Sequence, residues 1–347
     1  MRPEFTDPPK LTAGDRIAVV SPAYAAPADF PALHEQALLR LREDFHLEPV
    51  EFPTTRRHST AAARAEDLMA AYADPSIRAV LASIGGDDQI TVLPHLDPKP
   101  FLADPKPFLG FSDNTNLLNW LWTHGVAGYH GMSTMMHLAR GAGVQPIAAE
   151  SLRAALFTGG DVEIRPVELF SDEEIPWDDP AALTSSAVPY ASPGRVWHQA
   201  DRVVSAPAWG GCLEILHWTL AADRWVRPVE DYAGCVLLLE TSEEMPSGDE
   251  VFKMLRNFGE RGLLEQFPAI LVATAKGTVF FDPRPMAERV RYRDEQRAAV
   301  LRALAAYNPG AMVVFGVDFG HTDPQWVLPY GGRITVDGPA RRITAHY

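Results

Sequence analysis

The sequence predicts an α/β fold in two domains, the first around a mostly parallel sheet and the second a smaller α/β domain. The chain has 347 residues, more than a single hydrophobic core usually supports. Short apolar runs alternate with helix-like stretches, which is the pattern of strand–helix units on a parallel sheet. The hydrophobic share of 46% and the charged share of 22% are typical of a folded globular chain, so disorder is not expected.

The amino-terminal part supplies the first sheet. The expected strands cover 16–23, 77–86 and 106–111, and the expected helices cover 30–45 and 59–74. Ser59 or Thr60 is suited to cap the second helix, which ends before Pro75. The run 106–111 is continuously apolar, as expected for a strand covered on both faces, and a further helix starts from Thr115.

The amino-acid composition changes in the middle of the chain. Residues 158–210 are rich in Gly, Pro, Ser and acidic residues without sustained periodicity, and a loop this long is often functional. Beyond it, strands are expected at 234–240, 268–275 and 311–320, and helices at 247–267 and 292–308. We therefore divide the chain into an amino-terminal domain (1–160), a linker and substrate loop (161–205) and a carboxy-terminal domain (206–347).

Charge and cysteine content narrow the functional class. The net charge of −14 argues against a nucleic acid polymer as partner. No stretch reaches the roughly 20 apolar residues of a membrane helix, and the start has no signal-peptide core, so no membrane partner is expected. The only cysteines, Cys212 and Cys235, match no disulfide framework or zinc spacing. These features predict a cytoplasmic protein.

The sequence GFSDNT (110–115) places Ser112 where a strand turns into a helix. Such a turn exposes the hydroxyl at the carboxyl end of a sheet, with backbone amides beside it for an oxyanion. A helix cap is the alternative, and within these six residues it is the commoner one, because Ser112, Asp113 and Asn114 are all good caps. The turn SIGGDDQ (83–89) brings Gly86 to a second strand end; its glycines could approach a ligand or serve only the turn.

A nucleophilic serine needs a base and a group that orients it. His321 follows the expected strand 311–320, and Glu240 ends the run 234–240. Taken singly, His321 could be a turn residue and Glu240 a solvated strand end. Three strand ends that present Ser, Glu and His favour a catalytic set.

Metal chemistry is not expected. His130 and His137 in YHGMSTMMH are seven residues apart and would lie near one face of a helix, but no clustered carboxylates or thiolates accompany them. We therefore assign both to packing, and no metal or other cofactor is predicted.

Five blocks carry a resemblance to a known family. GFSDNT, SIGGDD, GGCLEIL (210–216), CVLLLETSEE (235–244) and FGHTDPQWVLPYG (319–331) together resemble the serine LD-carboxypeptidases, peptidase family S66. The resemblance runs from about Gly14 to Gly331 and is closer to the microcin C self-immunity branch than to the muropeptide branch. It implies a Rossmann-like amino-terminal domain, a swivelling-type carboxy-terminal domain and a homodimer with its active site where the domains meet.

The resemblance also implies roles for single residues. Ser112 becomes the nucleophile, His321 the general base and later acid, and Glu240 the group that orients the imidazole. The amides of Gly86 and Asp113 become the oxyanion hole. Because His321 must be neutral to act as a base, activity is expected to fall at low pH.

Departures from the muropeptide sequence pattern narrow the range of expected substrates. Gly211 and Cys212 stand in a Gly-Gly-Cys run where many muropeptide carboxypeptidases have Gly-Gly-Asn. Trp177, in the long loop, offers an aromatic face for a purine, although core tryptophans are commoner. We expect Trp177, Gly211 and Cys212 to contact a small-molecule or peptide substrate of the aminoacyl- or peptidyl-nucleotide type. A muropeptide LD-carboxypeptidase and a non-catalytic ligand-binding protein are the alternatives.

Overall fold

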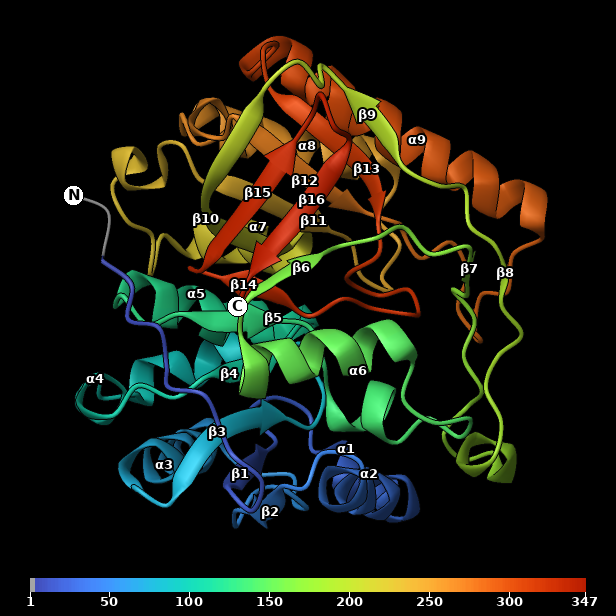
Figure 1. The fold of residues 1–347 in the computed structure, drawn as a ribbon. Helices are drawn as coiled ribbons and strands as arrows, with labels where there is room; N and C mark the ends of the chain where they lie inside the picture. Colours follow the sequence, from blue (N-terminus) through green and yellow to red (C-terminus); the bar gives the residue numbers. More distant parts are fainter. Residues whose placement is uncertain (1–3) are drawn as a thin grey trace.

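The computed structural model describes residues 4–347 and contains two sheets surrounded by helices (Figure 1). The amino-terminal sheet lies in the lower half of that view and the carboxy-terminal sheet in the upper half. The two-domain α/β architecture expected from the sequence is confirmed.

The first sheet has six strands in the order β14-β5-β4-β3-β1-β2. They are β1 (Arg16–Val20), β2 (Glu48–Glu51), β3 (Ile77–Ala82), β4 (Phe108–Gly110), β5 (Gly128–His130) and β14 (Leu328–Tyr330). The first five run parallel to their neighbours. Strand β14 comes from the far end of the chain and pairs antiparallel with β5. Strands β4 and β5 are fully buried, and burial on both faces explains the continuous apolar character of β4.

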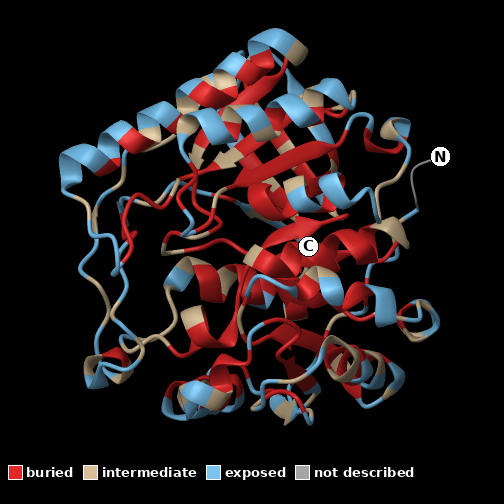
Figure 2. Cartoon of the chain, turned by 180° about the vertical axis from the view of Figure 1, so that it is seen from behind, coloured by how far each residue is buried: buried red, intermediate tan, exposed pale blue. Residues whose placement is uncertain are grey.

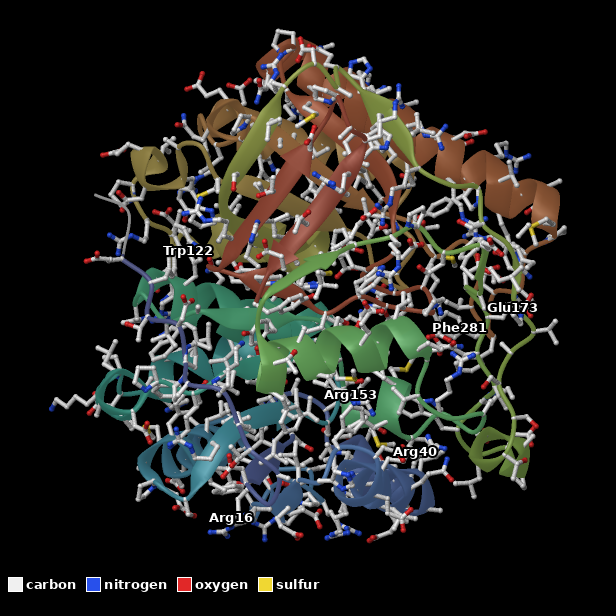
Figure 3. All side chains as sticks on the ribbon, viewed as in Figure 1. Arg16, Arg40, Trp122, Arg153, Glu173 and Phe281 are labelled. Carbon is white, nitrogen blue, oxygen red and sulfur yellow. The ribbon has the colours of Figure 1, made fainter. Side chains whose placement is uncertain are left out.

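Short and medium helices accompany this sheet. They are α1 (Ala26–Asp29), α2 (Pro31–Glu43), α3 (Ala61–Ala73), α4 (Lys99–Ala103), α5 (Thr115–Thr123) and α6 (Pro146–Arg153). Thr60, rather than Ser59, caps α3, since its Oγ1 accepts the Ala63 amide at 3.3 Å. Arg40 of α2 donates to the Leu138 carbonyl at 2.5 Å and so fixes the π-helical turn Thr134–Leu138 against α2 (Figure 3).

The second sheet has eight strands in the order β6-β16-β15-β10-β11-β12-β13-β9. They are β6 (Asp161–Glu163), β9 (Val196–His198), β10 (Val203–Cys212), β11 (Val236–Glu240), β12 (Ala269–Ala273), β13 (Met312–Val317), β15 (Arg333–Asp337) and β16 (Arg342–His346). Strands β10 to β13 form a parallel centre, and the outer strands pair antiparallel.

Three long helices belong to this half: α7 (Leu213–Ala222), α8 (Gly248–Glu260) and α9 (Met286–Tyr307). Ser247 and Glu250 form a capping box at the start of α8. Helix α9 begins at Met286, earlier than the sequence pattern predicts. Apart from Arg289, residues 286–291 are exposed, so no apolar period marks these turns.

The linker loop 161–205 is partly ordered into strands. It contributes β6 and β9 to the second sheet and forms a separate pair from β7 (Leu169–Phe170) and β8 (Tyr190–Ala191). The buried Asp172 accepts hydrogen bonds from Arg289 at 3.0 Å and from Arg293, and Glu173 binds Arg289 at 2.6 Å (Figure 3). These charge pairs therefore anchor the loop to helix α9.

One apolar cluster spans the two halves. Trp122 of α5 stacks on Tyr232 with ring centroids 4.9 Å apart, and Trp209 of β10 packs against both rings. A continuous band of buried residues crosses from one half to the other (Figure 2). This contact holds the carboxyl ends of β4 and β11 in fixed relation. Among the described residues, no helix combines the length and the apolar character that a membrane crossing requires.

Candidate active site

Ser112 occupies a strained turn between β4 and α5. Its φ is +60°, and it opens the single 3₁₀ turn Ser112–Asn114. A positive φ costs a non-glycine residue about 1–3 kcal/mol and is kept where the surroundings enforce it. Gly85 leaves space for the serine side chain, because a Cβ on Gly85 would lie 2.9 Å from Ser112 Cβ and 3.0 Å from Ser112 Oγ.

Hydrogen bonds lock the turn in place. The Gln89 amide donates to Asp113 Oδ2 at 2.9 Å, and Asn116 Nδ2 donates to Asp113 Oδ1 at 2.8 Å. Asn114 Nδ2 donates to the Ile84 carbonyl at 3.0 Å. Burial raises the pKa of Asp113 to about 6, and these hydrogen bonds oppose that rise. The Asp113 side chain thus holds the turn through two hydrogen bonds.

The predicted oxyanion donors lie at this turn and on the loop before Gln89. Asp113 follows the serine directly, and Gly86 follows Gly85, whose carbonyl accepts the Tyr24 amide at 3.0 Å. In residues 4–347, neither the Gly86 nor the Asp113 amide donates to a protein oxygen. Both N–H groups are free to bind a ligand oxygen, and the oxyanion hole stays a prediction.

His321 and Glu240 meet at the carboxyl ends of β13 and β11. His321 Nδ1 lies 2.5 Å from Glu240 Oε2, and both side chains are buried. Gly320 permits this approach: its φ is +85°, and a Cβ there would lie 2.8 Å from Glu240 Cβ. The structure thus brings together the base and the orienting carboxylate that the sequence predicts.

The third member, Ser112, makes no hydrogen bond to His321, but the residue before it contacts the imidazole. The ring of Phe111, the residue before the serine, contacts the His321 imidazole with centroids 5.1 Å apart. No protein hydrogen bond of Ser112 Oγ is found in the described chain. His321 Nε2 lies instead 3.1 Å from Glu243 Oε2.

Glu243 is the residue that sequence reasoning missed. It lies on the turn that follows β11, and its side chain is half exposed. The backbone and Oγ of Ser242 donate to the buried Glu214 at 2.9 and 2.8 Å, which fixes this turn. The acidic run ETSEE (240–244) was the available signal, because it places a second carboxylate three residues after Glu240.

The two carboxylates favour the charged imidazole. Burial alone lowers the pKa of His321, but Glu240 and Glu243 outweigh it and hold that pKa well above its usual value. Burial alone would raise the pKa of both carboxyl groups, and His321 reverses this and lowers them. This arrangement therefore favours the imidazolium form of His321, flanked by two carboxylates.

The residues predicted to contact substrate lie in different surroundings. Trp177 is half buried, and its ring packs edge-on against Phe30 at 5.3 Å. Cys212 is buried with its Sγ donating to Glu214 Oε2 at 3.4 Å, and burial raises the pKa of the thiol. Gly211 faces Thr115, since a Cβ on it would lie 2.7 Å from Thr115 Oγ1. Their contact with substrate stays a prediction.

The histidines assigned to packing are both buried but do not share a helix. His130 ends β5, and His137 lies in the π-helical turn Thr134–Leu138. Burial lowers the pKa of His137 to about 3, so this residue is neutral. No group of three or more metal-ligating side chains occurs among the described residues.

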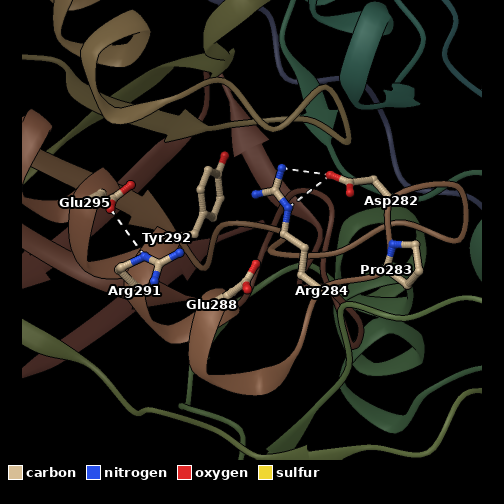
Figure 4. A pocket seen from close by; sticks show the side chains of 7 residues that line it. All are labelled: Asp282, Pro283, Arg284, Glu288, Arg291, Tyr292 and Glu295. Carbon is tan, nitrogen blue, oxygen red and sulfur yellow. Dashed lines mark hydrogen bonds and ion pairs between the residues drawn. The ribbon is translucent and has the colours of Figure 1, made fainter.

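A polar pocket of about 340 Å³ opens at the start of α9 (Figure 4). Its charges pair among themselves, as Arg284 with Asp282 at 2.9 Å and Arg291 with Glu295 at 3.7 Å. Tyr292 of this pocket donates to the Pro246 carbonyl at 3.1 Å. The pocket is lined by none of the predicted site residues.

Comparison with known proteins gives a consistent group of relatives. The LD-carboxypeptidase N-terminal domain matches residues 17–131, and the LD-carboxypeptidase C-terminal domain matches residues 205–336. A Streptomyces coelicolor protein, provisionally named a carboxypeptidase, is 29% identical over 97% of this chain and 98% of its own. The microcin C7 self-immunity protein MccF of Escherichia coli is 24% identical over 83% of this chain and 79% of its own. The murein tetrapeptide carboxypeptidase of Pseudomonas aeruginosa is 35% identical over 39% of this chain and 43% of its own.

Solved structures show the same fold. An MccF-like protein from Streptococcus pneumoniae in complex with AMP superposes with a TM-score of 0.81 at 26% identity, covering 96% of this chain and 99% of its own. MccF in complex with aspartyl sulfamoyl adenosine superposes with a TM-score of 0.82 at 20% identity, covering 99% and 98%.

Proposed function

This chain belongs to the LD-carboxypeptidase family, and we propose that it is a serine hydrolase that cleaves amide bonds through an acyl-enzyme on Ser112. The observation that carries the proposal is the strained serine turn beside a buried His321–Glu240 pair. A helix cap needs neither a positive φ nor a neighbouring imidazole–carboxylate pair, whereas an activated nucleophile uses both.

The proposed reaction begins when His321 is neutral and its Nε2 is free of Glu243. Nε2 takes the proton of Ser112 Oγ as the oxygen attacks the amide carbonyl, and Glu240 stabilises the imidazolium that forms. The amides of Gly86 and Asp113 receive the oxyanion. His321 then gives its proton to the departing nitrogen, and water hydrolyses the ester with the same groups.

We infer that the substrates are aminoacyl- or peptidyl-nucleotide amides or small peptides. Similarity to MccF over 83% of this chain, and to an AMP-bound MccF-like protein over 96% of it, supports the nucleotide type. Cys212 also donates to Glu214 and so offers substrate no amide of the kind an asparagine would. Murein is the second candidate, because a probable murein peptide carboxypeptidase of Bacillus subtilis is also 24% identical over 95% of this chain.

A substrate panel tests the proposal. The enzyme is incubated with an aminoacyl sulfamoyl adenosine and with a murein tetrapeptide, and products are identified by mass. We expect the free amino acid and the sulfamoyl nucleoside from the first compound. Release of D-alanine from the tetrapeptide alone would contradict the nucleotide type. Binding of either compound without any cleavage would favour a ligand-binding protein.

Neutralising Glu243 is expected to move the pH profile. Glu240 and Glu243 raise the pKa of His321, so the acid limb of kcat/KM in the wild type lies above pH 6.5, the ordinary histidine value. Glu243→Gln removes one of the two charges, so the limb shifts to lower pH and kcat/KM at pH 6 rises. Because Glu243 is half exposed, added salt diminishes the difference between wild type and variant.

Glu244→Gln is the matched control for this experiment. Glu244 lies next to Glu243 on the same exposed turn, and no ion pair joins it to His321 in residues 4–347. The substitution changes the net charge by the same amount and is expected to leave the acid limb in place. An acid limb of kcat/KM at the same pH in Glu243→Gln and in wild type would show that Glu243 does not set the pKa of His321.

A further inference from the structure

Behind the catalytic pair lies a second imidazole, that of His130. This residue ends β5, where it stands opposite Gly110 of β4, two residues before Ser112. Its side chain is completely buried, and His130 Nε2 lies 3.8 Å from Glu240 Oε1. Glu240 is therefore placed between two histidines, His321 on Oε2 and His130 on Oε1.

The atoms that face each other have no other partners. Among the described residues, neither ring nitrogen of His130 has a hydrogen-bond partner, and Glu240 Oε1 has none either. A buried charged oxygen left without a donor is costly, and nearly all such atoms in folded proteins are satisfied. The gap of 3.8 Å exceeds a normal hydrogen bond by less than about 1 Å, so a small approach closes it.

No cation offers Glu240 an alternative. Its ion pairs in the described chain are with His321 and His130 alone. Cys212, its neighbour in register on β10, is a buried thiol, and Glu214 is a second buried carboxyl group. Burial and then Glu240 raise the pKa of Glu214, which favours its neutral form. Ionised Glu240 thus depends on the two imidazoles.

Apolar contacts hold the His130 ring at this place. Phe319 meets it edge-on with centroids 5.7 Å apart, and Phe111 lies 6.4 Å away on the serine side. A Cβ on Gly211 would approach His130 Cδ2 to 3.3 Å, so β10 closes the third side. The ring cannot easily turn away from Glu240.

We propose that His130 is a positioning residue, which donates its Nε2–H to Glu240 Oε1 and thereby keeps Oε2 directed at His321. The inference rests on the proposed function, since it assigns His130 a part in aiming the triad. It replaces the packing role that the sequence suggested.

Two substitutions of His130 test the proposal kinetically. His130→Phe keeps an aromatic ring between Phe111 and Phe319 but removes the donor, and we expect kcat to fall about 10-fold with little change in KM. His130→Gln places an amide N–H near the position of Nε2 and restores most of kcat. In a Glu240→Ala background, His130→Phe should not lower kcat further, because the carboxylate that His130 positions is gone.

His34→Phe is the matched control. His34 is another fully buried histidine, and its Nε2 pairs with Glu51 at 2.9 Å on the far side of the first sheet. Loss of this pair should lower the melting temperature without changing kcat. A kcat for His130→Phe equal to wild type, or a loss that persists in the Glu240→Ala background, would overturn the proposal.

A spectroscopic measurement separates this inference from the proposed function. The Nδ1–H proton of His321, in its short contact with Glu240, should give a low-field proton resonance that needs no substrate. We expect His130→Phe to shift it, His130→Gln to return it and His34→Phe to leave it unchanged. An unshifted resonance in His130→Phe contradicts the role of His130, whereas lack of hydrolysis by the wild type contradicts only the proposed function.

Discussion

Ser112→Ala is expected to lower kcat/KM by about 10⁴-fold or more, because the attacking oxygen is lost while the rest of the site is retained. Hydrolysis of the preferred substrate, followed over the full substrate range, measures the loss. Substrate affinity should persist in the variant, as seen by calorimetric titration. Ser205→Ala, on an exposed strand position, should hydrolyse like wild type. Equal rates in Ser112→Ala and wild type would contradict a nucleophilic Ser112.

Ser112→Gly extends this prediction to stability. The wild-type φ of +60° is strained for serine but ordinary for glycine. The glycine variant should be inactive and yet more stable than Ser112→Ala by about 1 kcal/mol, measured by denaturant unfolding. A glycine variant less stable than the alanine variant would show that the turn stores no strain.

Gly85→Ala is expected to reduce kcat by about 100-fold while Ser112 is still present. The new methyl group would lie 3.0 Å from Ser112 Oγ and 3.2 Å from the Asp113 amide, so the nucleophile or the oxyanion donor must shift. Displacement of a reacting group by about 1 Å commonly costs this much. Steady-state kinetics together with the melting temperature distinguishes misplacement from unfolding.

Gly310→Ala is the control for that experiment. Gly310 has an ordinary φ, and nothing lies within 4 Å of a Cβ built on it. This variant should retain wild-type kcat. Wild-type kcat in Gly85→Ala as well would mean that the Ser112 turn tolerates displacement and is not the reacting centre.

Much of the fold follows from local pattern. Strands such as β4 and β11 are continuous apolar runs because both faces are covered, and this is visible in the sequence. Strand β14 joins the first sheet from residues 328–330, and β6 and β9 join the second sheet from the linker loop. These strands are short, and their partners lie far away in the chain, so no local pattern indicates the pairing.

Some residues of the candidate site could likewise be predicted from local pattern, and others could not. Ser112, Glu240 and His321 could be selected because each follows an apolar run and so reaches the sheet edge. Glu243 reaches His321 only because Ser242 is tied to Glu214, a contact between a turn and helix α7. His130 meets Glu240 across two different sheets. Contacts of this kind depend on tertiary packing, within the second half for Glu243 and between the two halves for His130, which no local sequence pattern indicates.

Covalent labelling tests most directly whether Ser112 is the nucleophile. A fluorophosphonate, which reacts with activated serines, is incubated with the enzyme above pH 8, where more of His321 is neutral. One adduct per chain is expected, on the peptide that contains Ser112, together with loss of hydrolysis in proportion to labelling. Hydrolysis that survives full labelling of Ser112, or inactivation by an adduct on another residue, would contradict the proposed mechanism.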